Sequence, residues 1–206
     1  MKFDTKRPPK AINIRKIKIH RVDEDIFLQK GLFGDGCYGS PCDDMCCRYG
    51  CDVDYSTLKV ILKNRKKVEK LIGARIEDCF STHVKVDDDY IGGAYAETRV
   101  RKEDNICAFH LRGEKGCALF YLWKIKGVSK RIIPTICRTY PITWHRGFLT
   151  IDRPLRKQCK CLEKYGCKKT TPPSLYDTQK KEVHALFDVP KELLKPTAPK
   201  TKKGRR

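Results

Sequence analysis

Cysteine is the residue type in this sequence with the clearest capacity for chemistry. The chain has 206 residues, and 12 of them are cysteines. Five of these fall between Cys37 and Cys51, where Cys46 and Cys47 are adjacent. Adjacent cysteines form a disulfide with each other only under strain, whereas several thiolates can converge on one cation. The clustering therefore indicates metal ligation, with disulfides, redox thiols and inert buried cysteines as the alternatives.

The cysteines outside this cluster are spread along the chain, so the fold would have to bring them to the metal. They are Cys79, Cys107, Cys117, Cys137, Cys159, Cys161 and Cys167. Zinc takes four tetrahedral thiolate or imidazole ligands, and an iron–sulfur cluster takes four thiolates. The surplus of cysteines without histidine-rich spacing favours all-thiolate ligation, as in a [4Fe–4S] cluster, although zinc accepts it too. Two metal sites, or one site with additional thiols, both fit this number of cysteines.

Several common cysteine motifs are excluded by spacing. The sequence contains no Cys-x2-Cys pair, which argues against ordinary zinc ribbons and thioredoxin-like motifs. A radical-SAM motif, Cys-x3-Cys-x2-Cys, fails because its third position is Tyr49 or Asp54. No glycine-rich phosphate loop or dinucleotide fingerprint occurs.

An ordered set of motifs resembles the YkgJ-like family, which is described as zinc- or iron-chelating and is named for a CxxCxxCC motif. The set comprises Cys46–Cys47, the step Gly50-x-Asp52-Val53 into a helix, Cys107, Cys117 and Cys137-Arg-Thr-Tyr-Pro141. The resemblance extends over residues 35–188. One departure is the cluster itself, which reads Cys37-x4-Cys42-x3-Cys46-Cys47 rather than having two residues between cysteines.

The resemblance implies a set of metal ligands. These are Cys42, Cys46, Cys47, Cys107, Cys117, Cys137, Cys159 and Cys161. Whether Cys37, Cys51, Cys167 or His110 also ligate stays open. The family includes longer flagellin lysine N-methylases, so a metal- or cluster-dependent protein-modifying enzyme, such as a lysine N-methyltransferase, is the alternative function. The sequence does not identify catalytic residues for it.

Four further residues, one of them a cysteine, have simpler interpretations. We expect Cys79 to be a buried small hydrophobic residue. Arg138 could donate hydrogen bonds to cluster sulfurs or form a structural salt bridge. Asp43 and Asp44 are expected to be solvated loop carboxylates.

The chain is strongly basic, with a formal net charge of +20. This charge is spread along the chain, with an excess of lysine and arginine in residues 1–30, 59–75 and 191–206. Distributed positive charge favours polyanions such as RNA through counterion release, and a solvated surface is the alternative. A nucleic acid is therefore a candidate partner, besides the metal ion or cluster.

The elements that must position the cysteines indicate a small α+β domain with short strands, hairpins and two or three helices. Apolar periodicity predicts these elements: an extended segment around Ile12–Ile19, a helix over Ser56–Ile72 capped by Asp54 or Ser56 and ended by Gly73, strands within His83–Arg101, a helix over Ala118–Ile125, a hairpin of Tyr140–Trp144 with Phe148–Asp152, and a helix over Ser174–Phe187.

The expected organisation is a basic lead-in over residues 1–30, a metal-binding domain over 31–189 and a disordered basic tail over 190–206. No apolar run approaches the roughly 18–20 residues needed to span a bilayer. The first ten residues lack the apolar core of a secretory signal. We therefore expect a cytoplasmic protein without a transmembrane segment.

Overall fold

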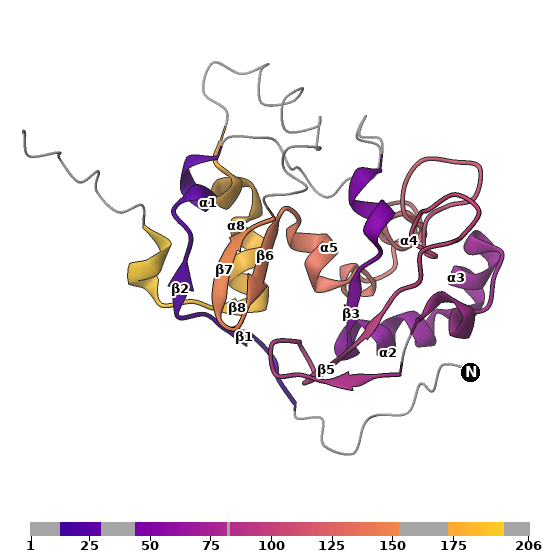
Figure 1. Cartoon of the computed structure of the whole chain (residues 1–206), viewed down its shortest axis with the longest axis horizontal. Coiled ribbons are helices and arrows are strands. Elements are labelled where there is room, and N and C mark those ends of the chain that lie inside the picture. The colour runs from indigo at the N-terminus through magenta and orange to yellow at the C-terminus, as the bar shows by residue number, and fades with distance from the viewer. Residues whose placement is uncertain (1–12, 30–43, 82, 153–172, 196–206) are drawn as a thin grey trace, which may run out of the picture.

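The computed structural model describes residues 13–29, 44–81, 83–152 and 173–195 (Figure 1). These residues form a mixed α+β fold, as expected. Its β-strands are labelled β, its α-helices α and its 3-10 helices η. Its elements in chain order are β1 (Ile17–Lys18), β2 (Arg21–Val22), α1 (Asp25–Leu28), η1 (Met45–Tyr49), β3 (Asp52–Asp54), α2 (Tyr55–Lys63), α3 (Arg65–Ile72), η2 (Ile76–Cys79), β4 (Lys85–Val86), β5 (Ala94–Glu97), α4 (Ala118–Lys124), η3 (Lys130–Ile132), α5 (Thr135–Thr139), β6 (Ile142–His145), β7 (Phe148–Ile151), α8 (Leu175–Leu186), β8 (Phe187–Asp188) and η4 (Lys191–Leu194).

Three small sheets are present among the described residues. In one, β5 lies between β3 and β4, and both pairings are antiparallel. In the second, β7 pairs antiparallel with β6 and parallel with β2. In the third, β1 pairs parallel with β8. The N-terminal strands therefore pair with strands from the C-terminal half of the chain.

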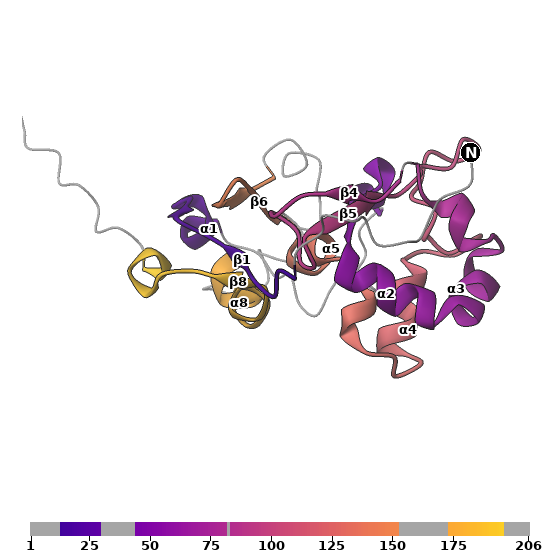
Figure 2. The ribbon, with the colours of Figure 1, turned by 90° about the horizontal axis from the view of Figure 1, so that it is seen from below.

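The first hydrophobic cluster includes buried side chains of helices α2, α3 and α4, which lie at one end of the molecule (Figure 2). Its largest fully buried side chains include Leu58 and Ile61 from α2, Ile72 from α3 and Leu122 from α4. Burying a large aliphatic side chain contributes about 1.5–3 kcal/mol each, so this cluster holds the three helices against the β3–β5 sheet.

The helix predicted over Ser56–Ile72 is divided into α2 and α3. Asp54 caps α2 as expected, and Gly73 ends α3 in the left-handed conformation at φ 64°. Between the helices, the Asn64 side chain donates a hydrogen bond to the Val60 carbonyl oxygen at 2.9 Å. Asparagine competes in this way for helical backbone groups, and its φ of −104° interrupts the helix. With the short α1 and α5, the described residues contain six α-helices rather than two or three.

The second hydrophobic cluster joins both ends of the chain. It combines Ile17 and Ile26 from the N-terminal segment with Ile142, Leu149 and Val183 from β6, β7 and α8. Residues 13–29 of the expected lead-in thus pack into the fold. Within the expected tail, Lys191–Leu194 form the 3-10 helix η4, whose apolar Leu194 packs against this cluster.

Of the extended segment predicted around Ile12–Ile19, only Ile17–Lys18 forms a strand, and Ile12 lies outside the described residues. The other predicted elements are confirmed with small changes of bounds. The β6–β7 hairpin turns at Arg146 and Gly147, which have φ of 47° and 70°. Two consecutive positive φ angles are typical of the tight turn that matches strand twist. Helix α8 begins with a capping box between Ser174 and Asp177. No helix in the described part of the chain has the length and apolarity to span a membrane.

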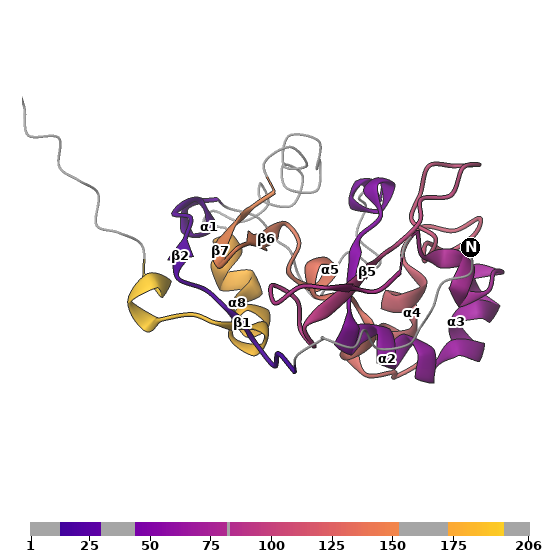
Figure 3. The same ribbon diagram turned by 60° about the horizontal axis from the view of Figure 1, so that its bottom comes forward.

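Helix α5 lies between β6 and β5 in Figure 3 and contacts β3, β6 and α8. Its start is held by Asp54, whose carboxylate accepts hydrogen bonds from the Thr135 backbone N–H at 3.0 Å and from the Thr135 hydroxyl at 2.8 Å. Asp54 is 1% exposed and also accepts hydrogen bonds from Ser56 and Thr57 at the start of α2. One buried carboxylate therefore fixes α5 relative to β3 and α2.

Candidate metal centre

Six cysteines line one cavity of about 580 Å³. They are Cys46, Cys47, Cys51, Cys107, Cys117 and Cys137. Among them, Cys46 packs against the second hydrophobic cluster, whereas Cys47, Cys51, Cys117 and Cys137 pack against the first. The thiols therefore gather where the two clusters meet.

Five separate segments supply these thiols. Cys46 and Cys47 lie on η1, and Cys51 immediately precedes β3. Cys107 forms a β-bridge with Val100, and its backbone N–H donates to the Cys47 carbonyl oxygen at 2.7 Å. Two further segments complete the set, since Cys117 is the N-cap of α4 and Cys137 lies within α5.

Thr98 holds two of these segments together. Its hydroxyl oxygen accepts a hydrogen bond from the Cys51 backbone N–H at 2.7 Å and lies 3.6 Å from the Cys107 sulfur. Gly50 makes this approach possible, because a Cβ at position 50 would lie 2.8 Å from the Thr98 hydroxyl oxygen. Its φ of 70° is also unfavourable for residues other than glycine.

The thiols contact one another within the cavity. Cys47 is within hydrogen-bonding reach of Cys46, and this contact and burial raise the pKa of the Cys47 thiol. Cys51 is within reach of both Cys107 and Cys137. The contact with Cys107 lowers the pKa of Cys51, but the contact with Cys137 and burial outweigh it and raise that pKa.

Burial and neighbouring thiols act in the same direction on the remaining cysteines. The contact with Cys51, followed by burial, raises the pKa of Cys107. Burial, followed by the proximity of Cys107, raises the pKa of Cys117 to about 12. The pKa of Cys137 is also raised, because burial and neighbouring thiols outweigh a lowering contact with Cys51. Without a cation, these groups are neutral thiols near pH 7.

In the described ranges, with their gaps at 30–43 and 153–172, no three or more His, Cys, Asp or Glu side chains form a group arranged to hold a metal ion. The thiols instead make pairwise contacts, with Cys51 between two partners. The donor type fits zinc or an iron–sulfur centre, since both accept thiolate sulfur. Ligation would require these thiols to lose protons, because metals bind the thiolate form.

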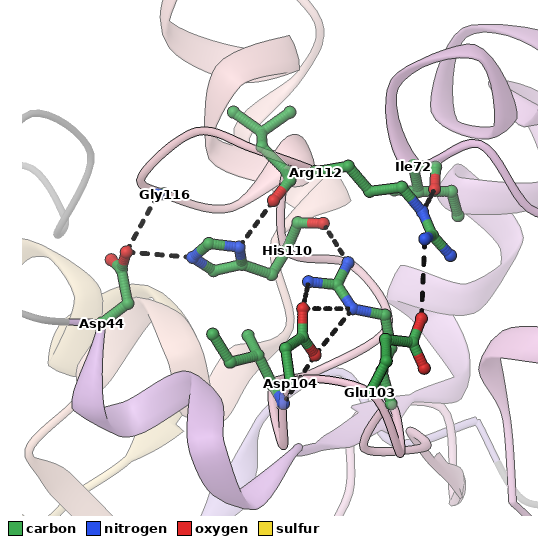
Figure 4. A network of polar contacts seen from close by, with 10 residues as sticks. Asp44, Ile72, Glu103, Asp104, His110, Arg112 and Gly116 are labelled. Atoms are coloured by element: carbon green, nitrogen blue, oxygen red, sulfur yellow. Dashed lines mark hydrogen bonds and ion pairs between the residues drawn. The ribbon is translucent and has the colours of Figure 1, made fainter.

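His110 lies beside the thiols with both ring nitrogens facing oxygen atoms (Figure 4). Its Nδ1 is 2.8 Å from the Leu111 carbonyl oxygen, and its Nε2 is 2.9 Å from Asp44 Oδ2. Because a metal ligand needs a free nitrogen lone pair, this arrangement places His110 as a structural residue rather than a ligand.

Asp44 is buried, contrary to the expectation of a solvated loop carboxylate. Its Oδ2 also accepts a hydrogen bond from the Gly116 N–H at 3.1 Å. Because Asp44 precedes η1 and Gly116 precedes Cys117, these bonds tie the segment of Cys46 and Cys47 to the segment of Cys117. The free-energy cost of burying the Asp44 carboxylate is reduced because it accepts a hydrogen bond from Gly116 and faces the His110 imidazole.

Arg138 forms a salt bridge rather than contacting the sulfurs. Its Nε donates to Glu182 Oε2 at 2.8 Å, and Lys130 Nζ lies 2.6 Å from the other oxygen of Glu182. Arg138 is directly bonded to Cys137 in the chain, so this bridge fixes α5 against α8. Of the two roles considered for Arg138, the structure shows the structural one.

The structure brings together five of the eight predicted ligands, namely Cys46, Cys47, Cys107, Cys117 and Cys137. The other three, Cys42, Cys159 and Cys161, lie outside the described residues, as do Cys37, Cys167 and Asp43. Cys79 is fully buried, as expected, and does not line the cavity.

Cys51 is the cysteine that sequence reasoning left open and the structure places centrally. Its position one residue after Gly50 and one before the strand Asp52–Asp54 was the available indication. Thr98 was missed altogether, because no spacing links it to Cys51 and only the β3–β5 pairing brings it there.

No protein-family model, no curated protein and no solved structure matches this chain.

Proposed function

We propose that this protein binds a metal centre through cysteine thiolates, and that the centre is an iron–sulfur cluster. The observation that carries the proposal is the convergence of six thiols from five segments on one cavity. Five chain segments place a cysteine there although the chain is only 206 residues long. Six neutral thiols do not form strong hydrogen bonds with each other, so packing alone gives little reason for this arrangement.

The thiol contacts divide the candidate ligands into two groups. Cys51, Cys107 and Cys137 form one group around Cys51, and Cys46 with Cys47 forms the other. Cys117 is close to both groups, since electrostatic repulsion from Cys107 and from Cys46 raises the pKa of its thiol. A cation in the cavity would favour the thiolate forms that burial and mutual repulsion disfavour. When bound, an iron–sulfur cluster supplies one-electron transfer.

An iron–sulfur cluster is favoured over a single zinc ion by the number of sulfurs and the size of the cavity. A zinc ion takes four ligands at about 2.0–2.3 Å and needs little space beyond them. The cavity of about 580 Å³ is lined by six cysteines and extends to residues such as Tyr90 and Trp144. This volume accommodates a multinuclear centre.

Metal analysis of the full chain tests the proposal. The protein would be purified without oxygen, and iron, zinc and acid-labile sulfide would be quantified per chain with a visible spectrum. Matched iron and sulfide with a broad absorption band near about 400 nm is the expected result. Stoichiometric zinc without sulfide would support thiolate ligation but overturn the cluster. A preparation with neither metal, even after reconstitution with iron and sulfide, would overturn metal binding.

The stability of the metal-free protein is expected to fall as pH rises above about 8.5, the ordinary pKa of cysteine. The fold raises the pKa of buried thiols, to about 12 for Cys117. Between these values the unfolded chain loses protons while the folded chain keeps them, so high pH favours unfolding. Each such thiol should lower the unfolding free energy by about 1 kcal/mol between pH 7.5 and 9.5.

Urea unfolding at these pH values, with reductant and chelator present, measures the effect. In the metal-loaded protein, measured without chelator, the ligating thiols carry no proton, whereas the thiols of the unfolded chain are protonated below about pH 8.5. We therefore expect its stability to rise with pH up to about 8.5 and to level off above it, the reverse of the metal-free trend. Equal or rising stability of the metal-free protein over this range would contradict the raised thiol pKa values.

A further inference from the structure

The helices at one end of the molecule carry more than half of the net positive charge. This helical end consists of residues 55–75 and 115–133, which contain α2, α3, α4 and η3 (Figure 2). These two ranges contain twelve lysines and arginines and a single acidic residue, Glu69. The elements are contiguous in space, because α3 contacts α4 and η3 contacts both α2 and α4.

Five lysines of α2 and α3 form the outer surface of this end, and we refer to them as the lysine ridge. They are Lys59, Lys63, Lys66, Lys67 and Lys70, and all five are exposed. At 3.6 residues per turn, each lies on the side of its helix away from the buried residues Leu58, Ile61, Val68 and Ile72.

No acidic side chain of the described residues neutralises the ridge. Glu69, the one acid of these helices, faces Arg65 at 3.7 Å and accepts a hydrogen bond from the Ile76 N–H at 3.0 Å. Glu77, on the neighbouring η2, also pairs with Arg65, at 2.6 Å. Glu69 and Glu77 therefore pair with Arg65 rather than with the lysines of the ridge, which face solvent.

The spacing of the lysines places like charges next to one another. Lys59 with Lys63 on α2 and Lys66 with Lys70 on α3 are each four residues apart. Pairs of like charge at this spacing disfavour a helix, and a polyanion bound to the ridge relieves the repulsion. The arrangement is thus unfavourable in isolation and favourable against a dense row of negative charges.

We propose that the helical end binds the phosphate backbone of a nucleic acid duplex without reading its sequence. A duplex is favoured over a single strand because the ridge has no exposed aromatic side chain on which bases could stack. The nearby Trp123 is occupied by the Lys124 and Lys130 ammonium groups, 4.7 and 4.5 Å from its ring centre. A membrane surface is disfavoured because the lysine ridge has no exposed large hydrophobic residue to insert, and Ile125, 55% exposed, is the single such residue of the helical end.

Two triple variants with the same loss of charge test the proposal. One replaces ridge residues by Lys63→Gln, Lys66→Gln and Lys70→Gln. The matched control carries Lys180→Gln, Lys181→Gln and Lys191→Gln, which remove exposed lysines of α8 and η4 at the other end. Full-length proteins would be titrated into a fluorescent 20-base-pair duplex at several salt concentrations, and anisotropy would report binding. Circular dichroism and urea unfolding confirm that both variants fold.

The ridge variant should bind the duplex about 10- to 100-fold more weakly near 100 mM salt than the wild type. The slope of log K against log salt concentration should be shallower by about 2.7, since each phosphate contact contributes about 0.9. The control variant should keep the wild-type slope to within about one contact.

Four results would overturn the proposal. They are no duplex binding by the wild type at 50 mM salt, equal weakening in both triple variants, tighter binding to a single strand of the same length, and tighter binding to phosphatidylserine vesicles than to the duplex. Metal content measured on the same samples separates these outcomes from a failure of the metal centre.

Discussion

Replacing Cys51 by serine is expected to lower the metal or cluster content of the purified protein by at least about tenfold, because a hydroxyl group does not replace a thiolate ligand. Cys51 is the thiol within reach of both Cys107 and Cys137, so its loss removes the link between two other candidate ligands. Metal, sulfide and visible absorbance per chain give the measurement, with protein reconstituted under identical conditions.

Cys79→Ala is the matched control for Cys51→Ser. Cys79 is completely buried in the first hydrophobic cluster, and burial raises its pKa to about 12, but it does not line the cavity. This variant should lose some stability and keep full metal content. Wild-type metal content in Cys51→Ser would remove Cys51 from the ligand set. Equal loss in both variants would trace the effect to folding rather than ligation.

The substitution Asp54→Ala is expected to lower the unfolding free energy by about 3–5 kcal/mol. The carboxylate accepts hydrogen bonds from Ser56, from the N–H and hydroxyl of Thr57 and from the N–H and hydroxyl of Thr135. Alanine would leave these donors, most of them buried, without an acceptor and would also remove the cap of α2. Urea unfolding followed by circular dichroism measures the change.

Asp78→Ala provides the comparison, since Asp78 is exposed and, within the part of the chain that the structure describes, its side chain pairs only with the exposed Arg75 at 3.1 Å. It should change the unfolding free energy by less than about 1 kcal/mol. Because Asp54 also anchors the helix that carries Cys137, Asp54→Ala should reduce metal content as well. A loss below about 1 kcal/mol in Asp54→Ala would show that Thr57 and Thr135 find other acceptors.

Local sequence rules predicted most of the helices and the hairpin. The cap at Asp54, the left-handed Gly73, the Arg146–Gly147 turn and the capping box at Ser174 each act within a few residues of the chain. Their effects depend on nearby backbone groups, so they can be recognised without knowing the fold.

The interruption at Asn64 could not be predicted from periodicity. Apolar spacing continues from Leu58 through Ile72, which is why one helix was expected. The division depends on a competing hydrogen bond from the Asn64 side chain and on the different partners of the two helices, since η3 packs against α2 and α4 against α3.

The sequence by itself determined that cysteine is unusually frequent and clustered, that the fold is α+β and that residues 59–75 carry a dense group of lysines and arginines. These properties follow from composition and from interactions between near neighbours. Tertiary structure alone decided that Cys46, Cys47, Cys51, Cys107, Cys117 and Cys137 share one cavity.

Tertiary structure also decided that His110 and Arg138 have structural roles. Their partners, Asp44 and Glu182, are 66 and 44 residues away in sequence. The physical reason is that burial and hydrogen bonding between distant segments depend on how the two hydrophobic clusters pack, and spacing along the chain carries no information about that packing.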